Sequence, residues 1–515
     1  YGALESNTTA SLNVAVGRDA LTTNTTGCGN TATGSCALKA NTTASRNEAV
    51  GAFALQSTTT GGCNSAMGYN ALGTNTTGIN NIAVGYNALV NSTTANYNVA
   101  VGACAGHANT TGDCITAVGY KTLQSNTTGG ENVAVGTNAM CANTTGCDNA
   151  TVGQDSLLAN TTGCRNSSIG RAALRFNETG KWNSGFGYSA MYSNTTGCQN
   201  TGSGAYALYG NTTGGLNTAF GEAAMKCTTT GSYNVAVGNS ALYTNTTASY
   251  NNAFGKHALH KNTTGTQNNA FGVNALSANT TGDYNTAMGS ESMKATTTGC
   301  CNAAYGFQSL YSNTTGDANV AIGGHALHSN TTADHNTAVG HQALCANTTG
   351  NFNTSVGRES MRNNTTGCRN TASGYAALKD NTTGCFNVAK GFMALTNNTT
   401  ASQNTATGYQ ALETNTTGLQ NTASGTFSMN KNTTGAENTA VGVTSLQDNT
   451  TGSCNTAVGR NALRCNTTGA YNTSVGSGSL CANTTASFNT GSGYLSLRSN
   501  TTGCVNAAFG AESLK

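Results

Sequence analysis

Four histidines lie close together in this sequence, and imidazole nitrogens are among the ligands that proteins use to hold zinc. They are His325, His328, His335 and His341, with Asp334 and Cys345 near them. Corresponding places elsewhere in the chain accept many residue types, so the cluster also fits solvent-exposed side chains. We predict no bound metal and no cofactor.

Motifs that would indicate catalysis are missing. The sequence holds no G-x-S-x-G elbow, no phosphate-binding P-loop and no H-E-x-x-H metal motif. Asp and Glu occur singly, whereas an acid–base site needs titratable groups gathered in one place. We predict that the chain is not an enzyme.

Nineteen cysteines raise the question of disulfide bonds. Three candidate pairs are separated by about the length of the tandem repeat described below, so their members lie in adjacent copies. They are Cys147 with Cys164, Cys368 with Cys385, and Cys465 with Cys481. A disulfide needs Cα atoms about 4.4–6.8 Å apart, which stacked copies provide. The alternatives are cross-links between secreted chains and ordinary thiols in a reducing compartment. An odd count leaves at least one thiol unpaired within the chain.

Twenty-six copies of the repeat carry N-x-T, the acceptor motif for N-linked glycans in secreted proteins. Our candidate acceptors are Asn24, Asn41, Asn75, Asn126, Asn143 and Asn177. Asn and Thr are also common at chain reversals. Four copies replace this Asn, with Thr58, Ser92, Thr228 and Thr296, yet keep the Thr two places on. That pattern favours a structural role for the Thr, with glycosylation as the alternative.

All these residues belong to one tandem repeat, which we interpret as a single continuous array over residues 1–515. Copies begin at Asn7 and recur every seventeen residues, thirty in all, and we number positions one to seventeen from that Asn. The consensus is N-T-T-G-x-x-N-T-A-V-G-x-x-A-L-x-x. Because the sequence starts and stops inside a copy, we expect a piece of a longer array.

Comparison of the copies separates fixed from variable positions. Position three is always Thr and position eleven always Gly. Position seven is Asn except at Ile115, and position fifteen is Leu or Met except at Gly106. Positions five, six, twelve, thirteen, sixteen and seventeen accept nearly any residue, so we expect them outside. Position eleven is expected to need a positive φ or a close backbone approach. Position four accepts Ala in seven copies and is expected not to need a positive φ.

Seventeen residues fit one coil of a β-solenoid. The Asn, Thr and Gly content disfavours helices, and helical repeats need about 33 residues or more. Extended chain at ~3.3 Å per residue gives a perimeter of roughly 56 Å. We predict an all-β fold, a β-solenoid of about thirty coils. Each coil is expected to have a strand over N-T-A-V-G, a second short strand over A-L and a corner at N-T-T-G. A coil spacing of ~4.8 Å gives a rod of roughly 140 Å.

Inward polar residues of stacked coils can bond one another in ladders. We predict such a ladder at position seven beside the invariant glycines, and another of Thr at position three. The first four rungs and their glycines are Asn13, Asn30, Asn47, Asn64, Gly17, Gly34, Gly51 and Gly68. Position ten is often Val, Ile, Met or Phe. It either belongs to the core or forms an outward stripe that contacts another chain.

Composition excludes several partners. The net charge is +3 over 515 residues, with Lys and Arg scattered singly, whereas nucleic-acid binding needs clustered positive charge. No apolar stretch is long enough to span a membrane. The chain has 66 Gly, no Pro and only 8% charged residues, which is unlike a typical soluble enzyme.

The run NTAVGRNALRCNTTG over residues 455–469 resembles repeats of bacterial and phage tail-fibre proteins. It is similar, more distantly, to the head repeats of trimeric autotransporter adhesins, which share an N-x-A-x-G strand in a β-roll. The resemblance covers the whole chain, although this chain is richer in cysteine. It implies an extracellular fibre shaft or adhesin at a cell or virion surface, with a trimer among its assembly states.

Together these patterns predict a structural subunit of an extracellular filament shaft without catalytic activity. We expect self-association into a filament or homo-oligomer, because uncovered sheet edges favour end-to-end stacking, and glycans as further partners. The alternative is a surface-binding adhesin whose regular rows of Thr and Asn bind a glycan or an ice lattice.

Overall fold

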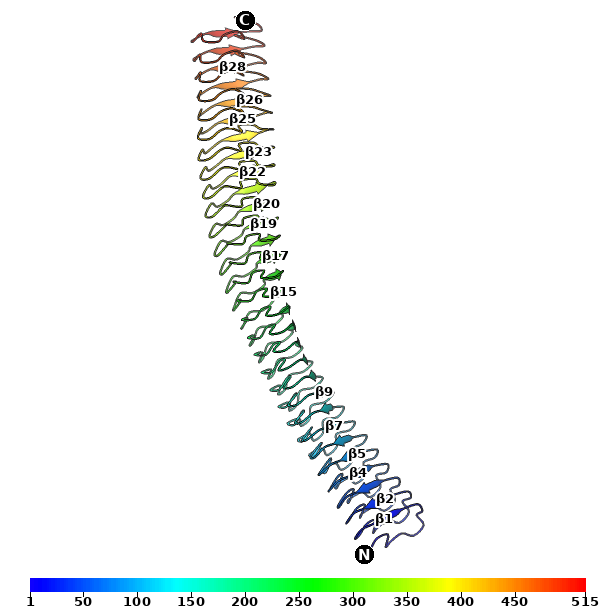
Figure 1. Cartoon of the computed structure of the whole chain (residues 1–515). Helices are drawn as coiled ribbons and strands as arrows, with labels where there is room; N and C mark the ends of the chain where they lie inside the picture. The colour runs from blue at the N-terminus through cyan, green and yellow to red at the C-terminus, as the bar shows by residue number, and fades with distance from the viewer. The chain divides into compact units, whose positions relative to one another are not determined.

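The computed structural model describes residues 1–515, which form two compact units, Tyr1–Thr264 and Gly265–Lys515. Each unit consists of strands, turns and bends, and every strand is three residues long. Within each unit the coils stack one on another, from blue to green in the first and from green to red in the second (Figure 1). The predicted all-β class is confirmed.

The first unit contains fifteen strands, one per coil. They are β1 (Val14–Val16), β2 (Thr31–Thr33), β3 (Glu48–Val50), β4 (Ser65–Met67), β5 (Ile82–Val84), β6 (Val99–Val101), β7 (Thr116–Val118), β8 (Val133–Val135), β9 (Ala150–Val152), β10 (Ser167–Ile169), β11 (Ser184–Phe186), β12 (Thr201–Ser203), β13 (Thr218–Phe220), β14 (Val235–Val237) and β15 (Asn252–Phe254).

The second unit also contains fifteen strands. They are β16 (Asn269–Phe271), β17 (Thr286–Met288), β18 (Ala303–Tyr305), β19 (Val320–Ile322), β20 (Thr337–Val339), β21 (Thr354–Val356), β22 (Thr371–Ser373), β23 (Val388–Lys390), β24 (Thr405–Thr407), β25 (Thr422–Ser424), β26 (Thr439–Val441), β27 (Thr456–Val458), β28 (Thr473–Val475), β29 (Thr490–Ser492) and β30 (Ala507–Phe509).

Successive strands of each unit pair in parallel, and the pairing register equals the sequence period. Ala49 of β3 lies opposite Ala66 of β4, and Ala338 of β20 lies opposite Ser355 of β21. Each residue therefore contacts its counterpart seventeen places later. A parallel sheet with this register is a β-solenoid, as the period predicted.

The predicted second strand over A-L is wrong, because positions twelve to seventeen form turns. The cause is a left-handed backbone at positions six, thirteen and fifteen, as at Arg46 (φ 61°), Phe53 (φ 62°) and Leu55 (φ 49°). β-Branched residues fit this conformation poorly. They accordingly occur once at position six, once at position thirteen and never at position fifteen. The turns still bond coil to coil, as in Leu38 N–H to Ala54 O, 3.0 Å.

The glycine at position eleven is needed for two reasons, as predicted. Gly17 has φ of +132°, and a Cβ added there would lie 2.5 Å from the carbonyl oxygen of Gly34 in the next coil. Glycines at position four, such as Gly27, lack a positive φ, which agrees with the Ala found there in seven copies.

The core of each coil mixes alanine, leucine and asparagine. Ala32, Ala37 and Leu38 are fully buried at positions nine, fourteen and fifteen, and so are Asn24 and Asn30 at positions one and seven. The strand directs position nine inward and positions eight and ten outward, because side chains alternate along a strand. Position ten is therefore an outward row rather than core. No helix in the structure is long and apolar enough to span a membrane.

Candidate functional site

The most regular polar feature is the predicted asparagine ladder at position seven. The Oδ1 atom of Asn30 accepts a hydrogen bond from the backbone N–H of Asn47 in the next coil, 2.9 Å. The Nδ2 group of Asn47 donates to the Gly61 carbonyl one coil further on, 3.0 Å. The ladder is confirmed, although its main partners are backbone groups rather than the neighbouring side-chain amides. Each rung ties the strand to the corner of the following coil.

A second asparagine ladder runs through position one, which the sequence indicated only as a corner. Nδ2 of Asn41 donates to Oδ1 of Asn24, 2.6 Å, and to the Ala44 carbonyl, 3.1 Å. The first bond joins adjacent coils and the second closes the corner of its own coil. The sequence signal for this ladder is the Asn found at position one in twenty-six copies. The glycan acceptor motif explains the same Asn in another way.

The six candidate glycan acceptors all belong to this second ladder. Asn24, Asn41, Asn75, Asn126, Asn143 and Asn177 are fully buried. Their Nδ2 groups already donate hydrogen bonds, as Asn126 does to Asn109 Oδ1 (2.9 Å) and to the Gly129 carbonyl (2.9 Å). A glycan attached to Nδ2 would displace these bonds and meet the next coil. The folded corner thus favours a structural role, and glycosylation stays a prediction.

Copies that lack Asn at position one interrupt the second ladder. Asn41, Asn75 and Asn211 precede Thr58, Ser92 and Thr228, respectively. The Oδ1 atoms of these three asparagines are buried without a hydrogen-bond partner. A buried acceptor left without a donor destabilises a fold by about 1–3 kcal/mol. The interruptions are therefore weak points of the stack.

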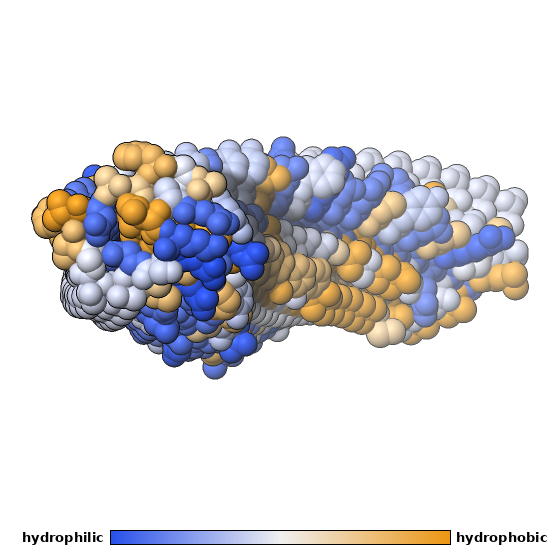
Figure 2. Space-filling model, turned by 90° about the horizontal axis from the view of Figure 1, so that it is seen from above, coloured by the Kyte–Doolittle hydropathy of each residue, from blue (hydrophilic) through white to orange (hydrophobic).

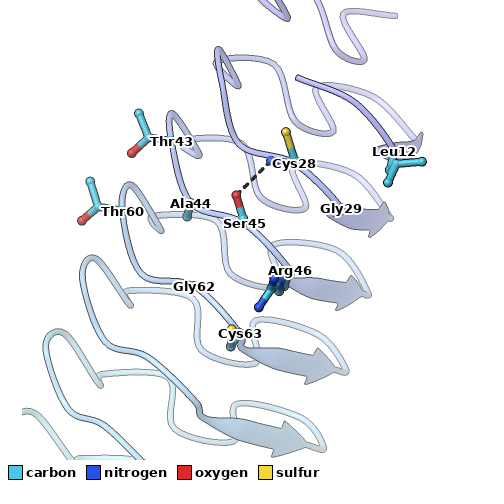
Figure 3. A pocket seen from close by; sticks show the side chains of 10 residues that line it. All are labelled: Leu12, Cys28, Gly29, Thr43, Ala44, Ser45, Arg46, Thr60, Gly62 and Cys63. Carbon is cyan, nitrogen blue, oxygen red and sulfur yellow. Dashed lines mark hydrogen bonds between the residues drawn. The ribbon is translucent and has the colours of Figure 1, made fainter. Parts of the chain in front are cut away.

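Threonine also forms a ladder, but at position two rather than at position three. Oγ1 of Thr25 donates to the Thr42 carbonyl, 3.0 Å, and Oγ1 of Thr42 donates to the Thr59 carbonyl, 3.1 Å. The prediction for position three is wrong, because those side chains point away from the coil. Thr26, Thr43 and Thr60 are exposed, and Thr43 and Thr60 stand one above the other at the corner (Figure 3).

Position five supplies a further rung that the sequence analysis missed. The backbone N–H of Cys28 donates to Oγ of Ser45 in the next coil, 3.0 Å, and the N–H of Cys300 donates to Oδ1 of Asp317, 2.7 Å. A cysteine accepts the same bond where Cys147 N–H lies 3.1 Å from Cys164 Sγ. Frequent Ser, Asp, Asn and Cys at this position was the signal. These residues share an acceptor one or two bonds beyond Cβ.

All nineteen cysteines are thiols in this structure. The sulfur atoms of Cys147 and Cys164 are 3.0 Å apart, and those of Cys368 and Cys385 are 3.1 Å apart. Cys465 and Cys481 also belong to adjacent coils, since the N–H of Cys465 bonds the Cys481 carbonyl. The structure therefore brings the predicted partners together, and the disulfides themselves stay a prediction.

One thiol in each of the two closest pairs has a raised pKa. The pKa of the Cys147 thiol is raised to about 12, mainly by the hydrogen bond with Cys164 and secondly by burial. Burial also raises the pKa of Cys385, with its bond to Cys368 as the second cause. Because the thiolate is the reactive form of cysteine, Cys147 and Cys385 are poor nucleophiles near neutral pH.

The histidine cluster is only partly brought together. The ring centroids of His325 and His328 are 5.4 Å apart, and those of His325 and His341 are 6.1 Å apart. His335 lies elsewhere and stacks on Phe352 at 5.0 Å. Burial, followed by the charge of His325, lowers the pKa of His328. No group of three or more His, Cys, Asp or Glu side chains has an arrangement that could hold a metal ion.

A shallow groove of about 550 Å³ lies beside the corner of the first coils. Arg46 and Cys63 line its floor together with the bonded pair Cys28 and Ser45 (Figure 3). Arg46 is its only charged side chain. The groove thus has no acid–base pair, and it is bounded by positions three to six, which recur in every coil.

The outer face of the sheet, formed by the side chains at positions eight and ten, is nearly free of charge. Of these sixty side chains only Glu48 and Lys390 are charged. The turn side chains are different, because positions twelve, thirteen and sixteen hold most of the salt-bridging residues, such as Lys379 and Glu359 at 3.2 Å. Apolar side chains gather in bands on the molecular surface (Figure 2).

Two exceptions to the repeat compensate each other inside one stack. Gly106 replaces the usual Leu at position fifteen, and Ile115 replaces the usual Asn at position seven of the following copy. A Cβ added to Gly106 would lie 3.6 Å from Cδ1 of Ile115, and Ile115 is fully buried. The isoleucine therefore fills the space that the missing leucine leaves. Its backbone N–H still donates to Asn98 Oδ1, 2.9 Å.

Comparison with protein-family models finds no family that matches this chain, and comparison with curated proteins finds no match.

Proposed function

We propose that this chain is a structural subunit, the shaft of an extracellular fibre, and that its function is mechanical rather than catalytic. The observation that carries the proposal is the set of side-chain ladders at positions one, two, five and seven, which join each coil to the next in addition to the backbone bonds. Repeat proteins of this kind gain stability from nearest-neighbour interfaces. The ladders recur along the chain and make most of those interfaces alike, so coils can be added without changing the interfaces.

The chain offers few features that an enzyme would need. The groove beside the corner of the first coils lacks an acid–base pair, and the raised pKa values of Cys147 and Cys385 keep these two thiols protonated near neutral pH. The polar groups inside the coils are used in bonding the coils to one another. The resemblance to fibre repeats supports the same function, with an extracellular location and self-association as parts of the proposal.

The test is to lengthen the array inside the second unit. Insertion of four consensus copies is expected to lengthen the particle by about 19 Å, at ~4.8 Å per coil, with unchanged circular dichroism per residue. Electron microscopy of single particles measures this length. A chain that does not lengthen in proportion to the inserted copies would contradict the proposal.

The threonine row at position three favours a second function, attachment to a repetitive surface such as a glycan or ice lattice. This Thr is present in all thirty copies, although no hydrogen bond within the fold uses the hydroxyls of Thr26, Thr43 or Thr60. An exposed Thr whose hydroxyl makes no bond within the fold is free to bind an external ligand. The Thr row at position two is less suitable for such attachment, because its hydroxyls are engaged in their own ladder.

Thermal hysteresis and polysaccharide pull-down measurements test the second function. We expect binding that is lost when Thr26, Thr43 and Thr60, with the next three residues of the row, are replaced by Lys. The matched control replaces six variable residues at position twelve of the same coils. A wild-type chain that shows neither hysteresis nor polysaccharide binding would remove this function and leave the structural one untouched.

A further inference from the structure

The outer face of the first unit carries a continuous row of apolar side chains. At position ten, nine successive coils hold an apolar residue. They are Val50, Met67, Val84, Val101, Val118, Val135, Val152, Ile169 and Phe186. Met67 is 50% and Ile169 51% exposed. Exposed apolar surface of this regularity marks an interaction surface.

The row is widest over strands β5 to β8, where position eight is apolar as well. We call these side chains the aliphatic patch: Ile82, Val84, Val99, Val101, Val118, Val133 and Val135. Ile82 and Val133 are more than two-fifths exposed. The one other outward side chain of these strands is Thr116, which also has a branched Cβ and a methyl group. No charged residue interrupts the patch.

The structure assigns the outer face of the first unit as the surface on which a second copy of this chain packs, sheet against sheet. This inference rests on the proposed shaft function and adds to it the face by which shafts associate. The outer face of the first unit carries one charged side chain, Glu48 in β3, and none over the aliphatic patch. This near absence of charge argues for a second copy, because such a face is complementary to itself and no opposite charge is needed on a partner. Interfaces between identical subunits are commonly formed in this way by the same patch on both.

The area of the outer face determines how much of the first unit must take part in the contact and how the axes of the two copies must be oriented. Fifteen strands, each about 10 Å long and ~4.8 Å apart, present about 700 Å² per copy. A stable interface buries about 1,200–2,000 Å² in total, so the whole unit suffices, whereas the aliphatic patch alone, at about 200 Å² per copy, does not. Because the face is only three residues wide, the axes must run nearly side by side for the contact to extend along the unit. Branched side chains then interdigitate as in a dry sheet–sheet interface.

The test compares full-length variants by sedimentation velocity under reducing conditions, which exclude disulfide-linked species. The face variant is Val101→Glu with Val135→Glu, two coils and about 10 Å apart, so that the new charges do not lie in adjacent coils. The matched control is Ala103→Glu with Thr137→Glu, in the same two coils but at position twelve. Circular dichroism of both variants should match that of the wild type.

We expect the wild type and the control to form the same pairs, and the face variant to raise the dissociation constant about 100-fold or more, because it buries like charges against each other. A wild-type chain that stays monomeric up to about 100 μM would overturn the assignment. So would a face variant that still associates, or a control that dissociates equally. None of these outcomes changes the lengthening by inserted copies, so the shaft proposal is tested separately.

Discussion

Gly106 and Ile115 are the exceptions to the repeat at positions fifteen and seven. Restoring the consensus at both, by Gly106→Leu with Ile115→Asn, should stabilise the chain, whereas either substitution alone should destabilise it. Gly106 has φ of +61°, close to the values of the leucines at the same position, so Gly106→Leu introduces no new backbone conformation. The Gly106→Leu substitution is unfavourable because the leucine side chain lacks space. An added Cβ would lie 2.8 Å from Cδ2 of Leu89 and 3.6 Å from Cδ1 of Ile115. Ile115 occupies the volume that the leucine side chain needs.

The expected magnitudes follow from packing and hydrogen bonding. Overpacking by Gly106→Leu alone should cost about 1–3 kcal/mol. Ile115→Asn alone leaves a cavity beside Gly106, a loss of about 2–4 kcal/mol. It also gains about two ladder bonds, near 1 kcal/mol each, so the net loss is about 0–2 kcal/mol. One gained bond is to the N–H of Asn132, which lacks the side-chain acceptor that its counterparts have. The double variant escapes both penalties and keeps the gained ladder bonds, so the coupling should be at least about 3 kcal/mol.

A double-mutant cycle followed by hydrogen exchange measures this coupling, because long repeat arrays do not unfold in one two-state step. Peptides that cover residues 92–132 should exchange faster in each single variant and more slowly than wild type in the double variant. Peptides from the second unit provide the control and should not change. Single-variant effects that simply add in the double variant would refute the compensation between Gly106 and Ile115.

Three further outcomes are expected from the ladders, the glycine column and the paired thiols. Thr228→Asn gives the buried Oδ1 of Asn211 a donor and should slow local hydrogen exchange by about 1–2 kcal/mol, whereas Thr228→Ser should not. Gly357→Ala, at φ +129° with a Cβ 2.5 Å from the carbonyl oxygen of Gly374 in the next coil, should lower the local free energy of unfolding, measured by hydrogen exchange, by about 3 kcal/mol. Gly324→Ala, where an added Cβ would make only an ordinary contact with His341 Cδ2 at 3.5 Å, should leave local stability unchanged. The pKa of Cys147 is raised to about 12 in the folded chain, against 9.0 when unfolded. The protonated thiol therefore contributes its whole stabilisation to the fold below pH 9. Stability should therefore fall as pH rises from about 9 to 12, and less so in Cys147→Ser.

The sequence was sufficient to predict the coil but not its turns. A strict period, invariant glycine and inward asparagine, as at Gly34 and Asn30, determine stacking in register, and stacking determines the parallel sheet. The second strand was predicted from apolar residues alone, and Leu55 shows why that fails. Its backbone is left-handed, which hydrophobic pattern does not report. The sequence does indicate a left-handed backbone in another way, because position fifteen never holds the β-branched residues Val or Ile.

The ladders at positions one and two were missed for a different reason. Asn24 and Thr25 belong to a motif with a second, chemical explanation, and periodicity cannot separate a glycan acceptor from a buried rung. Only three-dimensional placement does so, by showing Asn24 fully buried and bonded to the coil before it, 3.0 Å from Asn7 Oδ1. An exception then becomes informative. Thr228 leaves a buried acceptor on Asn211 without a donor, which identifies position one as structural.

The cysteine content also has a structural explanation that composition alone could not give. Eight of the nineteen cysteines stand at position five, and the side chains of five of them accept the backbone N–H of the preceding coil. Cys198 does so for Lys181 at 3.4 Å, as Ser45 does for Cys28 at 3.0 Å. Sulfur is a weaker acceptor than oxygen, but it reaches the same N–H. Cysteine at position five is therefore a substitute for serine in a ladder. Its number is no measure of how many cross-links the chain makes, nor of the redox state of its surroundings.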